Sequence, residues 1–387
     1  MKKTLLALTV LGAFAGSAMA ADVTLYGKID TGVKFTATDF DMKAANGQDD
    51  KHSFEMASGT NSGSRFGLKG TEDLGNGVKV GFVLENGFDS DDGSFDANGD
   101  DKMFGREAIV FLEGGFGKVA FGRMGIMNST AGSFSMGNFT PFGTGWGNVG
   151  DQNMLWDGST FATRWDNMIS YSTPEFAGLK VTAQYSFGSE TKDADGKVIG
   201  EEGKSSRDRY YGIGANYANG GLNIIAIVDS VNKKSYPVAG DVDDALRATF
   251  GGSYDFGFVK PFVAFAYVKD GSIKDFDKVY ETLNGKDFGT WDSYGVSLGA
   301  TAPVLSGTAY GMIGYMSAEN QTDGGNMVAG DELDRWMVGV GYEYPLSKRT
   351  FLYADGGYMQ DSYDFKDGSG GFDPKSCQFA LGLVHNF

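Results

Sequence analysis

Few side chains in this chain of 387 residues are suited to catalysis. Its only histidines, His52 and His385, lie near opposite ends of the sequence, and Cys377 is its one cysteine. A histidine-based triad or a zinc centre needs several such groups in one place, and a lone cysteine forms no intrachain disulfide. We therefore expect no catalytic residue, no metal site and no cofactor, and an enzyme is the least favoured class of function.

Two segments imitate ligand-binding motifs but fail at a required position. The segment from Thr191 to Glu202 has acidic residues at the spacing of a calcium loop, but it begins with threonine where that loop begins with aspartate. The segment from Gly203 to Ser205 ends like a phosphate-binding loop, but the glycine required five positions earlier is absent. We reject both motifs.

The composition excludes some partners and favours strands over helices. The chain has 50 acidic residues against 33 basic ones and a net charge of −17, which argues against a nucleic-acid partner. Aromatic residues make up 14% of the chain, and 60 glycines accompany only 7 prolines. With little helical periodicity, this composition indicates strands joined by turns.

The first twenty residues have the pattern of a secretory signal peptide. Lys2 and Lys3 precede an apolar stretch over 4–15, and Ala18-Met19-Ala20 forms a small-residue cleavage site. The apolar stretch is too short to cross a hydrocarbon layer of about 30 Å as a helix. We expect cleavage after Ala20, which leaves one domain over 21–387.

Alternation with a period of two recurs through the rest of the chain. From Val23 to Phe35 the odd-numbered positions are mostly apolar, and the even-numbered ones are mostly polar or charged. A half-buried strand of a soluble protein shows the same pattern. The number of such strands favours a barrel, because only a sheet closed on itself can place them all in lipid without an unpaired edge.

The alternation predicts sixteen strands. They run near 23–36, 64–72, 78–86, 104–112, 117–123, 165–172, 179–187, 209–218, 222–231, 245–254, 259–269, 292–302, 307–318, 334–344, 350–359 and 376–387. Their connections alternate between short, glycine-rich turns and long segments that carry most of the acids. This asymmetry is typical of an antiparallel transmembrane β-barrel with short periplasmic turns and long extracellular loops, and a soluble β-sandwich would not need it. Sixteen strands leave an aqueous channel.

Several segments resemble the Gram-negative trimeric porin family, in particular the general porins of proteobacteria. The similarity lies in the order and spacing of these segments across the whole mature chain. They are 23–28 (VTLYGK), 64–75 (SRFGLKGTEDLG), 105–107 (GRE), 116–123 (FGKVAFGR) and 379–387 (FALGLVHNF).

The resemblance implies a homotrimer in the outer membrane. Each subunit would be a general diffusion porin that passes ions and small hydrophilic solutes, with its third long loop folded into the lumen as a constriction. The segment 124–164 fits that loop, because it is the longest connection and its clear acids are only Asp151 and Asp157. Charges are costly to desolvate in a confined lumen, whereas a long external loop would be acidic like its neighbours.

The resemblance also implies a basic wall opposite that loop. Lys28, Arg65 and Arg106 are assigned to the lumen face of their strands, and Arg164 lies where the third loop rejoins the wall. Glu107 is then expected to point outwards, at a trimer contact or above the membrane band. The alternative for each basic residue is a solvated lumen charge with no selective role.

Between this wall and Asp151 or Asp157 we expect a transverse field that orients dipolar solutes. The basic wall favours anions, whereas the acidic loops favour cations. At physiological salt the screening length is about 8 Å, so distant loops act mainly on entry. On this balance the sequence predicts a weak cation preference.

The C-terminal strand ends on an aromatic residue. Phe379, Leu381, Leu383 and Phe387 share one face, which resembles the assembly signal read by the barrel-assembly machinery. A last strand that simply faces lipid would show the same pattern, and both readings are compatible. Periplasmic chaperones, lipopolysaccharide and outer-membrane lipids are the other partners that the resemblance implies.

Two other functions remain open. A substrate-specific channel would add a track of aromatic residues or a dense basic ladder along the lumen, and the sequence shows neither clearly. An adhesin or phage-receptor role would reside in the long loops and is compatible with a pore.

Overall fold

The computed structural model describes most of the chain after the predicted signal peptide. The described residues are 22–41, 51–95, 102–129, 131–136, 139–142, 155, 161–188, 191–192, 198–200, 202, 209–232, 243–273, 290–322, 328–366, 368 and 370–387. Within them, no helix is long and apolar enough to cross a membrane.

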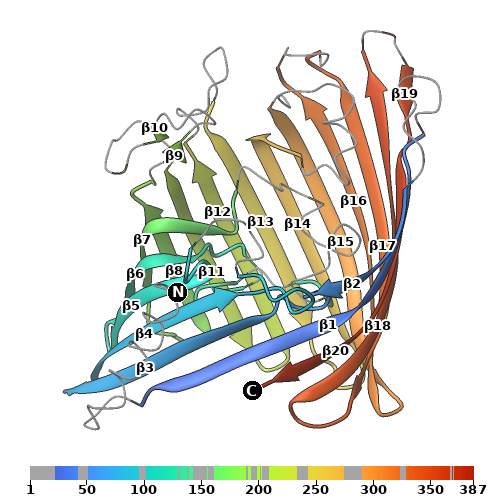
Figure 1. The fold of residues 1–387 in the computed structure, drawn as a ribbon. Coiled ribbons are helices and arrows are strands. Elements are labelled where there is room, and N and C mark those ends of the chain that lie inside the picture. Colours follow the sequence, from blue (N-terminus) through green and yellow to red (C-terminus); the bar gives the residue numbers. More distant parts are fainter. Residues whose placement is uncertain are drawn as a thin grey trace.

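Sixteen antiparallel strands of the described residues form a closed barrel, as the alternation predicted (Figure 1). Each strand pairs with its neighbours along the chain, and β1 also pairs with β20. The barrel strands are β1 (Thr24–Asp39), β3 (Arg65–Gly75), β4 (Val78–Gly87), β5 (Glu107–Gly114), β6 (Gly117–Gly125), β7 (Arg164–Ser172), β8 (Leu179–Ser186), β11 (Tyr210–Asn219), β12 (Leu222–Val231), β13 (Ala245–Tyr254), β14 (Lys260–Gly271), β15 (Trp291–Val304), β16 (Gly307–Asn320), β17 (Glu332–Pro345), β18 (Thr350–Phe365) and β20 (Lys375–Asn386).

The first and last strands close the ring. Their register runs from Lys28 opposite Asn386 to Asp39 opposite Lys375. It continues to the last residue, because Gly27 and Phe387 exchange two backbone hydrogen bonds of 3.0 Å. No edge of the ring is therefore left to present unpaired backbone groups to lipid.

The connections alternate as expected, with short turns at one end of the barrel and long segments at the other. In the turn between β3 and β4, Asn76 and Gly77 have φ values of 53° and 74°. These positive angles suit a tight hairpin and explain an Asn-Gly pair at this point.

The long connections contain strands that the sequence did not predict. They are β2 (Lys51–Ser58), β9 (Thr191–Lys192), β10 (Val198–Gly200) and β19 (Gly370–Phe372). Strand β2 pairs with β1 from Thr31 onwards, where β3 has already ended its own pairing with β1 at Lys28. The loop-side end of the wall is thus extended by loop residues.

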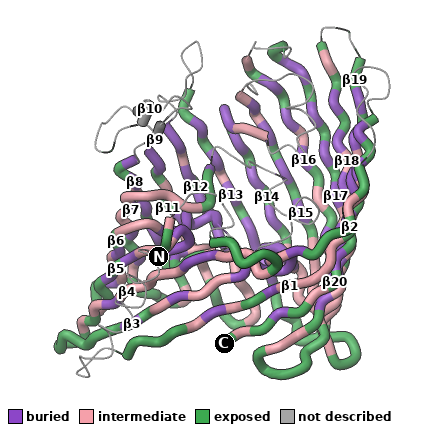
Figure 2. Tube along the Cα trace, in the orientation of Figure 1, coloured by how far each residue is buried: buried purple, intermediate pink, exposed green. Residues whose placement is uncertain are grey.

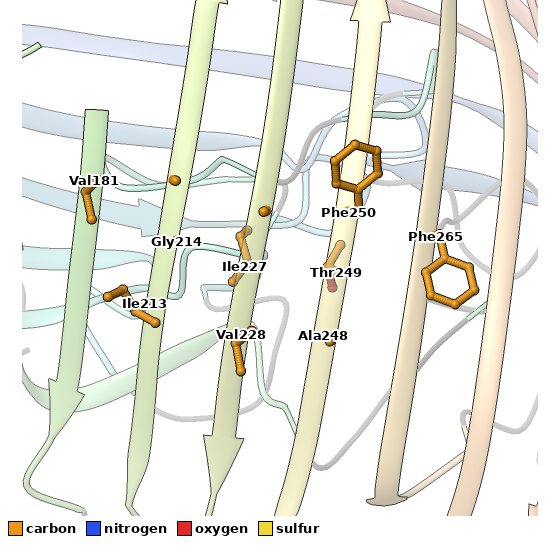
Figure 3. A pocket seen from close by; sticks show the side chains of 11 residues that line it. Val181, Ile213, Gly214, Ile227, Val228, Ala248, Thr249, Phe250 and Phe265 are labelled. Carbon is orange, nitrogen blue, oxygen red and sulfur yellow. The ribbon is translucent and has the colours of Figure 1, made fainter. Parts of the chain in front are cut away.

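The outer wall is apolar and the inner face is buried. Buried and exposed residues alternate along the long strands (Figure 2). Ile313 and Val340, for example, are 57% and 61% exposed on the outer face. An apolar hollow of about 450 Å³ lies across β8 and β11–β14, and Val228, Phe250 and Phe265 are among its lining residues (Figure 3). This surface is suited to contact with lipid tails.

A charged side chain on this outer surface should destabilise the barrel, and the loss of stability should be larger the closer the residue lies to the middle of the bilayer. We predict that Ile313→Lys, in the middle of β16, destabilises the lipid-folded barrel by about 2–4 kcal/mol, the range seen for lysine near the bilayer midplane. Val304→Lys, at the end of β15, is the matched control with an expected loss of about 0–1 kcal/mol. Urea unfolding in vesicles measures both, and equal losses would contradict the assigned membrane band.

Candidate functional site

The connection between β6 and β7 lies inside the barrel. Its described residues include large apolar side chains that are almost fully buried, although the connection belongs to no strand of the wall. They are Ile126, Met127, Phe134, Phe139, Phe142, Leu155 and Phe161. In Figure 1 the blue-green trace that follows β6 runs within the ring of strands. The described part of the third loop therefore folds inwards, as the resemblance implied.

Inward-facing glycines of the far wall accommodate this loop. A Cβ atom on Gly339 would lie 2.6 Å from Phe142, and one on Gly251 would lie 2.8 Å from Phe139. Real Cβ atoms do not come this close, so a side chain at either glycine would displace the loop. Among the described residues, pairs of this kind include Gly251 with Phe139, Gly299 with Pro141, Gly314 with Leu155 and Gly339 with Phe142, and Gly212 of β11 approaches Met127 in the same way.

Polar contacts tie the start of the loop to two parts of the wall, β13 on the far side and β8 beside β7. The Asn128 side-chain amide donates to the Thr249 hydroxyl at 2.6 Å. Gln184 accepts from the Met127 backbone N–H at 2.9 Å and donates to the Gly125 carbonyl at 3.1 Å. The loop is thus fixed by paired polar groups as well as by apolar packing, which specifies one position rather than a range.

The prediction for Glu107 is wrong. Its carboxylate points inwards and accepts hydrogen bonds from the Ser133 backbone N–H at 3.1 Å and the Ser133 hydroxyl at 2.9 Å. The face was assigned from Arg106, but β5 begins only at Glu107, and within this strand Glu107, Ile109 and Phe111 form the buried inner face. Glu107 lies opposite Glu85 in register and is 4% exposed. Through its two hydrogen bonds with Ser133 it anchors the third loop to β5.

Arg106 reaches the lumen for a different reason from the one predicted. It precedes β5, and alternation in that strand would place it on the other face from Glu107. Because the chain turns just before the strand, the Arg106 guanidinium instead donates to Glu85 at 2.7 Å. Glu85 also accepts from the Tyr26 hydroxyl at 3.0 Å.

The four predicted basic residues lie on neighbouring elements of one wall. Lys28 and Arg65 are opposite each other in register, and both donate to the Ser62 hydroxyl, at 3.3 and 2.7 Å. Arg164 donates to the Arg106 carbonyl at 3.0 Å. We call Lys28, Arg65, Arg106 and Arg164 the basic wall. Arg106 pairs with Glu85, whereas the other three form no ion pair within the described part of the chain.

A short inward turn over 59–64, which the sequence did not predict, supports this wall. The Asp30 carboxylate is fully buried and accepts from the backbone N–H groups of Asn61 and Ser62, at 2.8 and 2.7 Å. It also accepts from the Tyr353 hydroxyl at 2.9 Å. Alternation placed Asp30 on the lumen face, but its partners come from distant segments. Asp30 therefore positions Ser62, which in turn contacts Lys28 and Arg65.

Elsewhere on the inner wall, two arginines are neutralised. Arg247 pairs with Asp229 through bonds of 3.0 and 2.6 Å, and Arg335 pairs with Asp361 through two bonds of 2.6 Å. Phe161 of the third loop lies 4.2 Å from the Arg247 guanidinium. Asp151 and Asp157, the expected acidic partners of the basic wall, lie outside the described residues.

Comparisons with known proteins agree with this geometry. A family model described as Gram-negative porin matches residues 7–364. An outer membrane porin protein of Bordetella pertussis is 35% identical and aligns over 100% of both chains. An anion-selective porin from Comamonas acidovorans has a TM-score of 0.66 and 26% identity, with 95% of this chain and 100% of that chain covered.

The fold is also that of OmpT of Vibrio cholerae in a trimer form. The TM-score is 0.61 at 18% identity, with 95% of this chain and 100% of that chain covered. The closed barrel and the named relatives locate the protein in the cell outer membrane. The chain belongs to the Gram-negative porin family, which is a family of channels rather than of enzymes.

Proposed function

We propose that the protein is a general diffusion channel for ions and small hydrophilic solutes, and that its constriction lies between the basic wall and the third loop. The observation that carries this proposal is the anchoring of the loop across the lumen by apolar side chains set against wall glycines. A fixed loop narrows the channel permanently, and charged groups beside it favour solutes that retain their water.

We propose that this constriction favours anions. Lys28, Arg65 and Arg164 form no ion pair in the described part of the chain, so their charge acts on a passing ion. Charges within a screening length of about 8 Å outweigh more distant ones. The weak cation preference predicted from the acidic loops finds no support in the comparisons, and the solved relative from Comamonas acidovorans is an anion-selective porin.

Assembly and export are proposed on the resemblance and the strand pattern. Residues 1–20 would be removed as a signal peptide, and three barrels would associate as a homotrimer. The four C-terminal residues expected to form the assembly signal are between 36% and 49% exposed on the outer wall: Phe379, Leu381, Leu383 and Phe387. There they would be accessible to the assembly machinery during insertion and to lipid afterwards.

Neutralising the basic wall should lower the anion preference. In a tenfold KCl gradient we expect a reversal potential of anion sign for the wild type. The double variant Lys28→Gln and Arg65→Gln should lower the anion-over-cation permeability ratio several-fold. Lys348→Gln, which removes an exposed charge in a short turn, is the matched control and should behave like the wild type.

A cation-sign potential for the wild type would contradict the anion proposal and restore the expectation from the acidic loops. Single-channel recordings of the same preparation test the pore itself. We expect conductance steps grouped in threes, and the absence of such grouping would contradict the trimeric channel.

Removing one apolar anchor should loosen the third loop. Phe142 is 2% exposed and packs edge-on against Tyr310 with ring centroids 5.2 Å apart. Phe142→Ala removes interactions worth about 3–5 kcal/mol in a typical core, so we expect more frequent spontaneous closures and greater open-channel noise. Phe258→Ala, in a short turn where the ring is 71% exposed, is the control. Identical recordings for Phe142→Ala and the wild type would contradict the anchoring role.

A further inference from the structure

A polar cavity lies under the third loop, and none of the four basic-wall residues lines it. It has a volume of about 280 Å³ and is formed between loop residues 133–136 and the inner faces of β7, β8, β11 and β12. Ser172 ends β7 and Lys180 is the second residue of β8, so the cavity is near the short-turn end of the lumen. Hydroxyl and carboxamide groups dominate its lining: Ser133, Ser135, Ser172, Thr182, Asn216 and Asn223.

Internal hydrogen bonds hold the lining of this short-turn cavity in place. The hydroxyls of Ser172 and Thr182 are 2.7 Å apart, and both residues are buried. The Asn216 amide donates to the Asn223 side-chain oxygen at 2.6 Å and to the Ile224 carbonyl at 3.2 Å. On the loop side of the cavity, Ser133 donates two hydrogen bonds to the Glu107 carboxylate. The groups that face a solute are therefore set in advance, which lowers the entropic cost of binding.

Several polar groups of the cavity remain available to a ligand. Among the described residues, the Lys180 ammonium has neither an ion pair nor a hydrogen bond. The Asn223 amide N–H groups and the Asn216 side-chain oxygen likewise have no partner in the described part of the chain. One cation together with free amide donors and acceptors matches a solute that carries both a negative charge and hydroxyl groups.

A second lysine adds to the positive potential beside the cavity. The Lys118 ammonium lies 3.9 Å from the Phe111 ring centroid and 5.4 Å from that of Phe134, which lines the cavity. Glu113 faces Lys118 in register and partly balances it. Lys180 is thus the lining charge that acts on a ligand directly, while the Phe134 ring offers an apolar surface to its carbon skeleton.

We propose that the short-turn cavity is a binding station for small polyhydroxylated carboxylates of about monosaccharide size. The volume is just below the roughly 300–1,000 Å³ of pockets for drug-sized ligands, which suits a sugar acid. The proposal rests on the proposed channel function, because the solute reaches the cavity through the lumen. Binding there would hold the solute briefly beside the short-turn end of the lumen. The channel would then pass sugar acids in preference to other solutes of equal size.

Transient block of single channels by gluconate tests the proposal. In planar bilayers with KCl we expect gluconate, added on the short-turn side, to produce resolved blocks. Glucose, which lacks the charge, and acetate, which lacks the hydroxyls, should not. Lys180→Gln should shorten the gluconate blocks about tenfold, the effect of losing one charge-assisted hydrogen bond. Lys260→Gln, an inner-face change near the same end but outside the cavity, is the matched control.

Equal block by all three solutes, or equal block durations in the wild type and Lys180→Gln, would overturn the proposal. Isothermal titration of the detergent-solubilised protein with gluconate separates this result from a failure of the channel function. Binding that is lost in Lys180→Gln but retained in Lys260→Gln supports the station even if KCl conductance is absent. A protein that conducts KCl but binds no gluconate would refute the binding proposal and leave the channel function intact.

Discussion

Pairing of backbone groups around a closed ring is the constraint on which the rest of the structure depends. Lipid offers no hydrogen bonds, so each N–H and C=O within the membrane must find a partner in the protein. The register between β1 and β20 meets this requirement down to the exchange between Gly27 and Phe387. Because the outer face must then be apolar, polar chemistry is confined to the inside of the barrel and to its two ends.

A ring of sixteen strands is too wide to be filled by its own side chains, and here the third loop occupies part of the interior. The loop is held by contacts between residues that are distant in the sequence, such as Phe142 with Gly339 and Asn128 with Thr249. Glycines of the wall are therefore part of the pore architecture, because they determine how closely the loop approaches the wall. The width of the remaining passage follows from that approach.

The alternation of the sequence was sufficient to predict the sixteen barrel strands, because period two directly reports which face is buried, but it did not predict the four short strands of the long connections. It also assigned Lys28 and Arg65 to one face, and the two residues lie opposite each other in the register of β1 and β3. It was wrong for Glu107 because the lumen face was assigned from Arg106, which lies in a turn before β5 and does not follow the alternation of that strand. The partners of Asp30 and the glycines that face the third loop could not be predicted, since they depend on contacts between segments far apart in the chain.

The central claim is that the third loop is fixed against the far wall in the conducting state. Cysteines at Asn128 and Thr249, whose side chains are 2.6 Å apart, test it most directly in a Cys377→Ser background. We expect oxidation or a short thiol crosslinker to join the two positions and to leave the single-channel conductance unchanged. Failure to crosslink in the folded barrel, or a crosslink that closes the channel, would contradict the claim.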